Sequence, residues 1–469
     1  MARESSKVSN IEIFEDLPVS RAVRTMAVPT VISQLIVLIY NMADTFFIGR
    51  TNDPYMVAGV SLILPFFNIS LSLSGLAGIG GGALISRLLG EKRRSEARKV
   101  FSFCVWLGLF VSALFSLGTL LFMRPLILLL GAKVNTYAYA SSYAFFVIVC
   151  GGVPTVLSNT LANLIRSVGE SRKAGLGITM GGLINIALDP LFMFVLLPDG
   201  MEIAGAGAAT FLSNCIVCAY FIVVLARLGK TEPVLRLCPP RSIPTWQSIA
   251  GVFTVGVPSA IATFLFDLDY IVIDRLMSGY TDTALAAIGI VLKAERLPLN
   301  IGVGICQGMV PIVAYNYSAK NYSRMNAVKR YSLRLGLICA AASIALYQIF
   351  AGRIMGIFIN DAATVVLGTG FLRVRVLATP LMFLSFFHVH LFNGFGKGGY
   401  ALFLGATRWL VFNIPMLFLL NALFGMYGIV WSQVTADILT VVLSLLVYRR
   451  YERRVFVSTA QQKDLPSQG

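Results

Sequence analysis

Polar side chains that can hold a cation or a proton lie inside long apolar stretches of this sequence, where an ionised carboxylate costs about 3 kcal/mol or more. Five of them form the main candidate set: Tyr40, Asp44, Asn185, Asp189 and Thr210. Two pairs within the set are four residues apart in the chain, so the members of each pair share one face of a helix. Counting about 1.5 Å per residue from the outer ends of their stretches places Asp44, Asp189 and Thr210 at nearly the same depth.

The chemistry of this set is that of a small cation site. Carboxylate, amide and hydroxyl oxygens are ligands that suit Na+, and two carboxylates in one apolar site repel each other, which favours binding of a proton. The residue types predict a Na+ or H+ site at four members and leave the ion open: Asp44, Asn185, Asp189 and Thr210. Pro190 disfavours helical geometry at Asp189, so we expect a bend there. The simpler alternative is that both acids only accept hydrogen bonds in packing or at helix ends.

A second group of charged residues lies in two later apolar stretches. It comprises Asp267, Asp269, Asp274 and Arg275, followed by Lys293, Glu295 and Arg296. One interpretation is a set of interhelical ion pairs along an aqueous cleft. The other interpretation makes Asp267, Asp269 and Glu295 part of a substrate cavity or adds one of these acids to the coupling chemistry. We also assign Gln34 to that cavity.

Signatures of catalysis and of structural metals are lacking in the sequence. The chain has only two histidines, and its seven cysteines lack metal-ligand spacing. The glycines near Gly80 are not followed by the Lys-Ser/Thr of a phosphate-binding loop. We therefore expect no catalytic residue, no structural metal, no cofactor and a protein that is not an enzyme.

The elements that must position these side chains are membrane helices. Hydrophobic residues make up 57% of the chain and charged residues 13%, about half the charged share of a soluble domain. Apolar runs long enough for a bilayer predict an all-α integral membrane protein. The twelve predicted spans lie near 26–48, 55–88, 101–122, 137–165, 174–197, 203–226, 249–278, 283–316, 331–351, 364–393, 400–421 and 427–448.

The distribution of basic residues predicts the orientation. Most Lys and Arg lie in the N-terminal segment, in every second loop and in the C-terminal tail, whereas the opposite loops hold only Arg50, Arg124, Lys133 and Arg353. By the positive-inside rule, both termini face the cytoplasm. The net charge of +16 is spread between the spans, so we expect the lipid bilayer as a partner and no nucleic acid.

Internal similarity divides the chain into two halves. Four segments recur in order at nearly constant offset: residues 28–30 match 257–259, 80–92 match 308–320, 152–154 match 378–380, and 167–175 match 394–402. Two six-span copies keep the same orientation, which implies a pseudo-twofold axis along the membrane normal and a central cavity. The predicted domains are an N-terminal lobe (1–232), a cytoplasmic linker (233–247) and a C-terminal lobe with the tail (248–469).

Several motifs resemble those of multidrug and toxic compound extrusion transporters, within a wider group that includes flippases for polysaccharides and lipid-linked precursors. They are YNMADTFFIG from Tyr40, SGLAGIGGGALISRLLG from Ser74, NTLANLIRSVGESRKAG from Asn159, INIALDPLFMF from Ile184 and CQGMVPIVAYNYSAKNYSR from Cys306. The resemblance implies a cation or proton site at Asp44, Asn185, Asp189 and Thr210, and it makes Tyr40 a neighbouring cavity residue.

The resemblance and the buried acids together predict a secondary active antiporter, since no ATP site is visible. It is expected to export small cationic or amphiphilic compounds in exchange for H+ or Na+, as a monomer in a bacterial cell membrane. A flippase for a lipid-linked saccharide is the main alternative. A sensory or scaffold membrane protein is a third, and it gives the buried acids no purpose.

Overall fold

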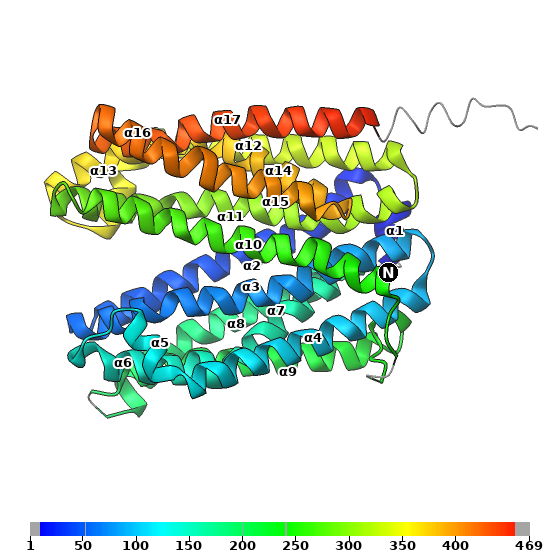
Figure 1. The fold of residues 1–469 in the computed structure, drawn as a ribbon, viewed down its shortest axis with the longest axis horizontal. Helices are drawn as coiled ribbons and strands as arrows, with labels where there is room; N and C mark the ends of the chain where they lie inside the picture. Colours follow the sequence, from blue (N-terminus) through cyan, green and yellow to red (C-terminus); the bar gives the residue numbers. More distant parts are fainter. Residues whose placement is uncertain (1–9, 52, 199, 240–241, 455–469) are drawn as a thin grey trace, which may run out of the picture. The chain divides into compact units, whose positions relative to one another are not determined.

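Helices make up nearly all of the described chain (Figure 1). The computed structural model describes residues 10–51, 53–198, 200–239 and 242–454, and no strand occurs among them. Eleven helices in this part of the chain are long and apolar enough to cross a membrane, and one bent pair makes twelve if it forms a single span. The prediction of an all-α membrane protein with twelve spans is confirmed.

The spans and their bounds follow the predicted order. The first six are α2 (Val19–Gly49), α3 (Pro54–Gly90), α4 (Arg94–Leu121), the pair of α6 (Val134–Ala144) with η1 (Phe145–Cys150) and α7 (Gly152–Ser167), α8 (Ser171–Leu191) with η2 (Phe192–Leu196), and α9 (Glu202–Leu228). The last six are α10 (Trp246–Met277), α11 (Asp282–Ser318), α12 (Tyr322–Phe358), α13 (Ala362–Arg375) with η4 (Val376–Ala378) and α14 (Thr379–Gly394), α15 (Gly398–Ala406) with η5 (Thr407–Asn413) and α16 (Ile414–Phe424), and α17 (Met426–Glu452). Short helices α1 (Asn10–Glu15), α5 (Met123–Leu129) and η3 (Pro233–Leu235) lie between spans or at their ends.

The fifth span changes its helical form beside a candidate acid. α8 ends at Leu191, directly after Pro190, and the π-helix η2 follows. Proline has no N–H to donate and its ring crowds the preceding turn, and π-helical turns are frequent at functional sites. The irregularity expected at Asp189 therefore takes the form of a wider helical turn, whereas α2 continues through Pro29.

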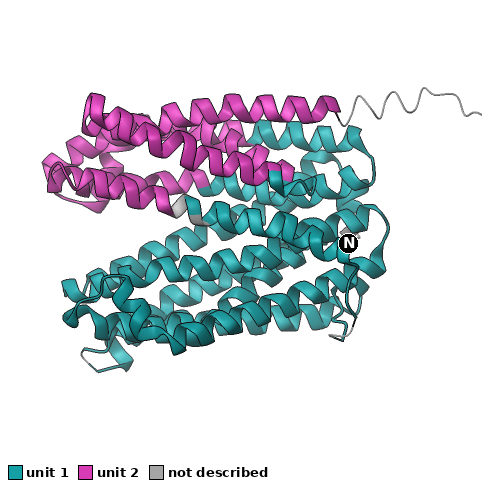
Figure 2. Ribbon diagram, in the orientation of Figure 1, with its two compact units in different colours: residues 1–267, 300–335, 393–399 teal, residues 268–299, 336–392, 400–469 magenta. Residues whose placement is uncertain are grey.

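Two compact units divide the chain, and each has its own buried apolar clusters (Figure 2). Unit 1 holds residues 1–267, 300–335 and 393–399, and unit 2 holds residues 268–299, 336–392 and 400–469. This division by compactness does not follow the predicted linker. Unit 1 contains the whole first half of the sequence together with parts of α10, α11 and α12 from the second half.

Glycines explain why parts of α10 and α11 belong to unit 1. A Cβ atom added to Gly304 would lie 2.7 Å from Cα of Val31, and one added to Gly308 would lie 2.6 Å from Cα of Ala27. Gly256 of α10 packs in the same way on the backbone of α3. Small residues let membrane helices approach closely, so α11 and α10 pack directly on α2 and α3.

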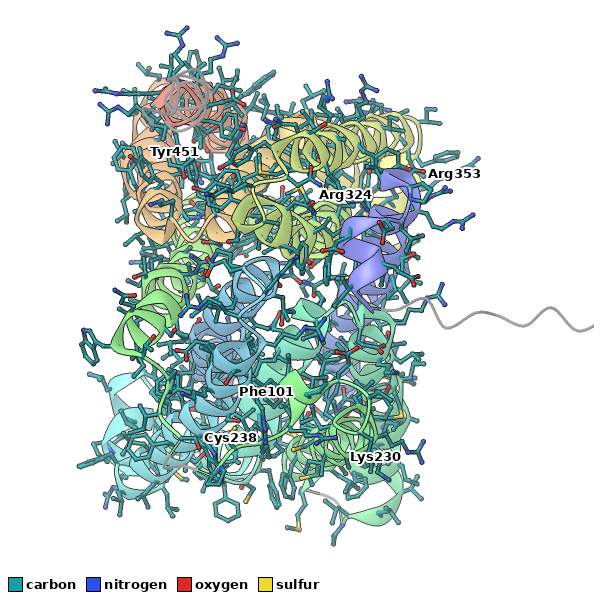
Figure 3. All side chains as sticks on the ribbon, turned by 90° about the vertical axis from the view of Figure 1, so that its right-hand side faces the viewer. Phe101, Lys230, Cys238, Arg324, Arg353 and Tyr451 are labelled. Atoms are coloured by element: carbon teal, nitrogen blue, oxygen red, sulfur yellow. The ribbon has the colours of Figure 1, made fainter. Side chains whose placement is uncertain are left out.

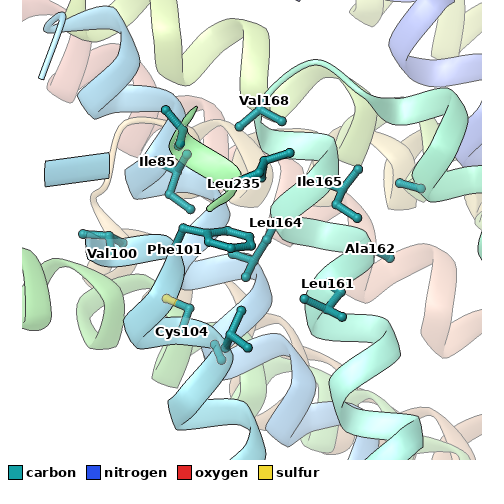
Figure 4. Close-up of a cluster of buried hydrophobic side chains, with 14 of the residues drawn as sticks. Ile85, Val100, Phe101, Cys104, Leu161, Ala162, Leu164, Ile165, Val168 and Leu235 are labelled. Carbon is teal, nitrogen blue, oxygen red and sulfur yellow. The ribbon is translucent and has the colours of Figure 1, made fainter. Parts of the chain in front are cut away.

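The segment between α9 and α10 is held against α4. Leu235 of η3 is buried beside Phe101 in an apolar cluster of unit 1 (Figure 4). The backbone N–H of Cys238 donates to Oγ of Ser102 at 2.7 Å. The predicted linker at 233–247 is thus anchored to the first half of the chain by packing and hydrogen bonding.

The helix α1 packs on the turn between α11 and α12, also within unit 1. The ring of Phe14 stacks on Tyr315 with centroids 5.0 Å apart. Arg324, labelled in Figure 3, donates from Nε to the carbonyl of Phe14 and from Nη2 to that of Leu17, each at 2.6 Å. These contacts tie the beginning of the chain to its second half.

Candidate functional site

Three predicted site residues meet on α8 and α9 in unit 1. Nδ2 of Asn185 donates to Oδ1 of Asp189 at 3.1 Å and lies 3.3 Å from Oγ1 of Thr210, to which it also donates. All three side chains are buried, and Asp189 has no exposed surface. The spacing of four residues places Asn185 and Asp189 on one helix face, as the sequence predicts.

Asp44 approaches this group from α2. A Cβ atom added to Gly182 of α8 would lie 2.6 Å from Cγ2 of Ile36 and 3.2 Å from Cδ1 of Tyr40, so these two helices are in close contact. Asp44 and Asp189 are near enough for their charges to interact, and the Tyr40 hydroxyl interacts with both. The structure therefore brings together all five members of the main candidate set.

Tyr143 of α6 is a partner of this site that the sequence analysis missed. Its hydroxyl donates to Oδ2 of Asp44 in a long hydrogen bond of 3.5 Å. Tyr143 is 4% exposed and interacts electrostatically with both acids. No spacing in the sequence connects α6 with α2, so only the packing of the helices reveals this contact.

The two acids have neutral partners only. Among the described residues no Lys, Arg or His forms an ion pair with Asp44 or Asp189. Three oxygens of this site are buried and have no hydrogen-bond partner among the described residues: Oδ1 of Asp44, Oδ2 of Asp189 and Oδ1 of Asn185. Two carboxylates inside an apolar helix bundle that lack a basic partner require a proton or a cation to balance their charge. An all-oxygen set of acceptors suits a hard cation such as Na+ as well as a proton.

A cavity of about 280 Å³ adjoins the acids within unit 1. It is lined by side chains of α2, α3, α7, α8 and α9, with Thr263 of α10 and Gln307 of α11. Gln34, Tyr40, Asn185 and Thr210 are part of its wall. Asn185 and Thr210 thus belong both to the acid site and to the cavity.

One face of α7 lines this cavity with polar side chains, which the sequence analysis did not single out. The face comprises Thr155, Ser158, Asn159, Asn163 and Arg166, together with Ala162. Polar residues that recur at helical spacing inside an apolar span indicate an aqueous or ligand-facing surface. The pattern was visible in the sequence, and its part from Asn159 onward lies in a stretch already quoted for its resemblance to the extrusion transporters.

The second charged group lies in unit 2 and is paired internally. Nδ2 of Asn413 donates to Oδ1 of Asp269 at 2.7 Å. Arg375 donates to both carboxylate oxygens of Glu295 at 2.7 and 2.8 Å. The side chain of Asp267 lies outside the described residues. Neither Asp269 nor Glu295 is part of the wall of the unit 1 cavity.

The partners in unit 2 come from helices that the sequence analysis did not connect. Glu295 of α11 pairs with α13, while its neighbour Arg296 lies over the ring of Tyr270 at 4.7 Å. Arg408 of η5 pairs with Asp437 of α17 at 2.8 Å. These buried pairs join α11 to α13 and η5 to α17.

A protein-family model named MatE matches the chain twice, over residues 29–191 and 258–419. The chain belongs to the MatE family. The two matched ranges begin 229 residues apart, in agreement with the repeat found in the sequence. The resemblance to extrusion transporters is thereby confirmed, and the chain is a multi-pass membrane transporter.

Relatives of this MatE protein include bacterial multidrug exporters. It is 29% identical over 456 residues to the multidrug export protein MepA of Staphylococcus aureus (strain N315), covering 97% of this chain and 99% of the relative. The MepA protein of Staphylococcus saprophyticus subsp. saprophyticus is also 29% identical, with the same coverage of both chains.

Solved structures share the fold of this MatE protein. A multidrug resistance MATE family transporter in an outward-facing conformation superimposes with a TM-score of 0.88 and 20% identity, covering 94% of this chain and 97% of the other. A mutant of the Vibrio cholerae MATE transporter VcmN gives a TM-score of 0.87 and 18% identity, covering 96% and 99%. These similarities confirm the two-lobed, twelve-helix architecture.

Proposed function

We propose that this MatE protein is a secondary active antiporter that exports small cationic or amphiphilic organic compounds in exchange for H+ or Na+. The observation that carries the proposal is the pair of acids: Asp44 and Asp189 interact inside a membrane-spanning helix bundle, and none of the described residues is a base that neutralises them. Such a pair binds a proton or a small cation in order to balance its charge. The MepA relatives are named multidrug export proteins, and this supports organic compounds as the cargo.

Each of the two acids has one oxygen held by a neighbouring side chain and one oxygen left for the ion. Asn185 holds Oδ1 of Asp189 and leaves Oδ2 available, and Tyr143 holds Oδ2 of Asp44 and leaves Oδ1 available. The two available oxygens are where we place the proton or cation. Oδ1 of Asn185 would be a third ligand for Na+.

Coupling follows from the shared residues of the two sites. Asn185 and Thr210 bond to each other and line the cavity where we place the organic compound. Binding of the cation therefore alters groups that contact the compound. Exchange requires only that the two ligands favour different conformations. One cation that moves inward through 100 mV supplies about 2.3 kcal/mol, which supports a gradient of about fiftyfold for a compound without net charge.

Orientation and location complete the proposal. The distribution of Lys and Arg supports both termini in the cytoplasm, and the bacterial relatives support a bacterial cell membrane. We place the polar end of the cavity at Arg166 towards the cytoplasm, because α7 ends beside the basic segment at residues 167–173.

Imposed ion gradients test the proposal. The full chain is reconstituted in liposomes with a fluorescent cationic dye, and dye movement is followed with a pH gradient at zero Na+ or with a Na+ gradient at fixed pH. At least one gradient should drive uphill dye movement, and the one that does identifies the coupling ion. Movement of dye that ignores both gradients would exclude cation-coupled antiport.

A further inference from the structure

The cavity of unit 1 has one charged side chain in its wall. Of the described residues that line it, only Arg166 carries a formal charge, and its side chain is 6% exposed. Asp44 and Asp189 are not part of the lining. A compound in this cavity therefore meets a fixed positive charge that belongs to the protein.

Asn163 fixes the guanidinium of Arg166. Nη1 of Arg166 donates to Oδ1 of Asn163 at 2.7 Å, and Nδ2 of Asn163 donates to the carbonyl of Asn159 at 3.0 Å. All three side chains line the cavity. The contact runs back along the helix to the preceding turn, so Arg166 extends from the last turn of α7 along the polar face and does not fold over the helix end.

The charge of Arg166 has no counterion in the described part of the chain. Nε of Arg166 is buried and has no hydrogen-bond partner there. The neighbouring acid Glu170 pairs instead with Lys173 at 2.8 Å. A buried guanidinium without a carboxylate is unfavourable, and its planar donors match the two oxygens of a carboxylate. A basic residue at this position interacts favourably with the C-terminal end of the α7 dipole. That interaction does not explain why the buried Nε of Arg166 beside the cavity is left without an acceptor.

We propose that Arg166 selects exported compounds that carry a carboxylate, and that zwitterionic amphiphiles are the preferred class. The inference rests on the proposed function, since it takes this cavity as the site of the exported compound. The carboxylate binds the free donor face of Arg166. The cationic group points to the opposite end, where Tyr40 and Asn185 separate the cavity from the two acids. The α7 wall of the cavity runs from Thr155 to Arg166, about 16 Å at about 1.5 Å per residue, which is long enough for an extended aromatic zwitterion.

A matched pair of dyes isolates the carboxylate. Rhodamine 110 carries a free carboxylic acid, and rhodamine 123 is its methyl ester, so the two differ in charge at one group. Binding of each to the purified full chain in nanodiscs is measured by fluorescence polarisation. The variants are Arg166→Gln, which removes the charge, and Arg166→Lys, which keeps the charge and loses the paired planar N–H donors. Arg172→Gln on the exposed side of α8 is the matched control.

Arg166→Gln should weaken binding of rhodamine 110 by at least about tenfold, the worth of one charge-assisted hydrogen bond, and change binding of rhodamine 123 by less than about twofold. Arg166→Lys should give an intermediate loss of affinity for rhodamine 110 alone. If the Arg166→Gln variant does not fold, the comparison of Arg166→Lys with the wild type tests the inference. The control should bind both dyes like the wild type.

Two results overturn the inference: an equal loss for both dyes, or no loss for either. A wild-type protein that binds neither dye overturns it as well. The proposed function fails on different evidence, since it requires ion-driven transport, which the imposed gradients measure separately. Transport driven by a gradient together with equal binding of both dyes would leave the antiporter standing and remove only the role of Arg166.

Discussion

The buried pair of Arg375 on α13 and Glu295 on α11 should contribute strongly to the stability of unit 2. Two hydrogen bonds of 2.7 and 2.8 Å join them, and their side chains are 1% and 6% exposed. Removing one partner of a buried pair costs about 3 to 5 kcal/mol because the other charge is left unpaired. Tyr270 keeps a hydrogen bond of 3.2 Å to Glu295, so we expect Arg375→Met to cost about 3 kcal/mol, the lower end of that range.

A double-mutant cycle measures this pair. The free energy of unfolding is determined in mixed micelles by titration with a denaturing detergent for Arg375→Met, Glu295→Gln and the double variant. The double variant should lie within about 1 kcal/mol of the wild type, because replacing both charges removes the unpaired one. Additive effects, or a cost of less than about 1 kcal/mol for Arg375→Met, would refute the pairing. The double variant should still export dye, since neither residue lines the unit 1 cavity.

Three further variants test packing and capping. Gly182→Ala places a Cβ atom 2.6 Å from Ile36 and should destabilise the fold by about 1 to 3 kcal/mol and reduce ion-driven transport. The control Gly118→Ala, whose Cβ atom meets nothing within 4 Å, should change neither the stability nor the transport. Arg324→Ala removes hydrogen bonds to the α1 segment and should speed proteolysis near the N-terminus; unchanged cleavage would contradict that contact. The N–H and hydroxyl of Thr364 donate to Asp361 and lower its pKa. The stability lost in Asp361→Ala should therefore be constant near neutral pH and disappear as pH falls through that lowered pKa. A stability difference between variant and wild type that grows in acid would contradict the cap.

The proximity of the main candidate residues could be predicted because a regular helix converts sequence spacing into depth. Asn185 and Asp189 share a face at a spacing of four residues, and counting from the span ends put Asp44 and Thr210 at the same level. Membrane spans make such counting effective, since their ends are fixed by the bilayer thickness. In the structure, Asn185 bonds to Asp189 within α8 and to Thr210 of α9, and Asp44 of α2 lies near enough to Asp189 for their charges to interact.

Partners across helices could not be predicted in the same way. Depth gives the level of a residue but not the direction in which its helix face points, and that direction depends on packing. Glu295 therefore pairs with Arg375 on α13, although closer candidates in the sequence were its neighbours Lys293 and Arg296. Tyr143 reaches Asp44 for the same reason.

The compact units also depend on packing that the repeat does not reveal. The internal similarity divides the chain near residues 233–247, and the family model matches once on each side of that segment. Close glycine contacts such as Gly308 on Ala27 nevertheless place part of the second half in unit 1. The two halves of the sequence therefore reflect the internal repeat, whereas the two compact units reflect which helices pack together.

Uphill transport by Asp189→Asn tests the central claim most directly. The side chain keeps its shape and its hydrogen bond partner Asn185, but it loses the charge that we assign to cation binding. In liposomes with the driving gradient identified for the wild type, the variant should equilibrate dye across the membrane and fail to concentrate it. The control variant Asp53→Asn, at the start of α3 and outside the acid pair, should concentrate dye like the wild type. Accumulation by Asp189→Asn to the wild-type ratio would contradict the account, because coupling would then not depend on the buried acid.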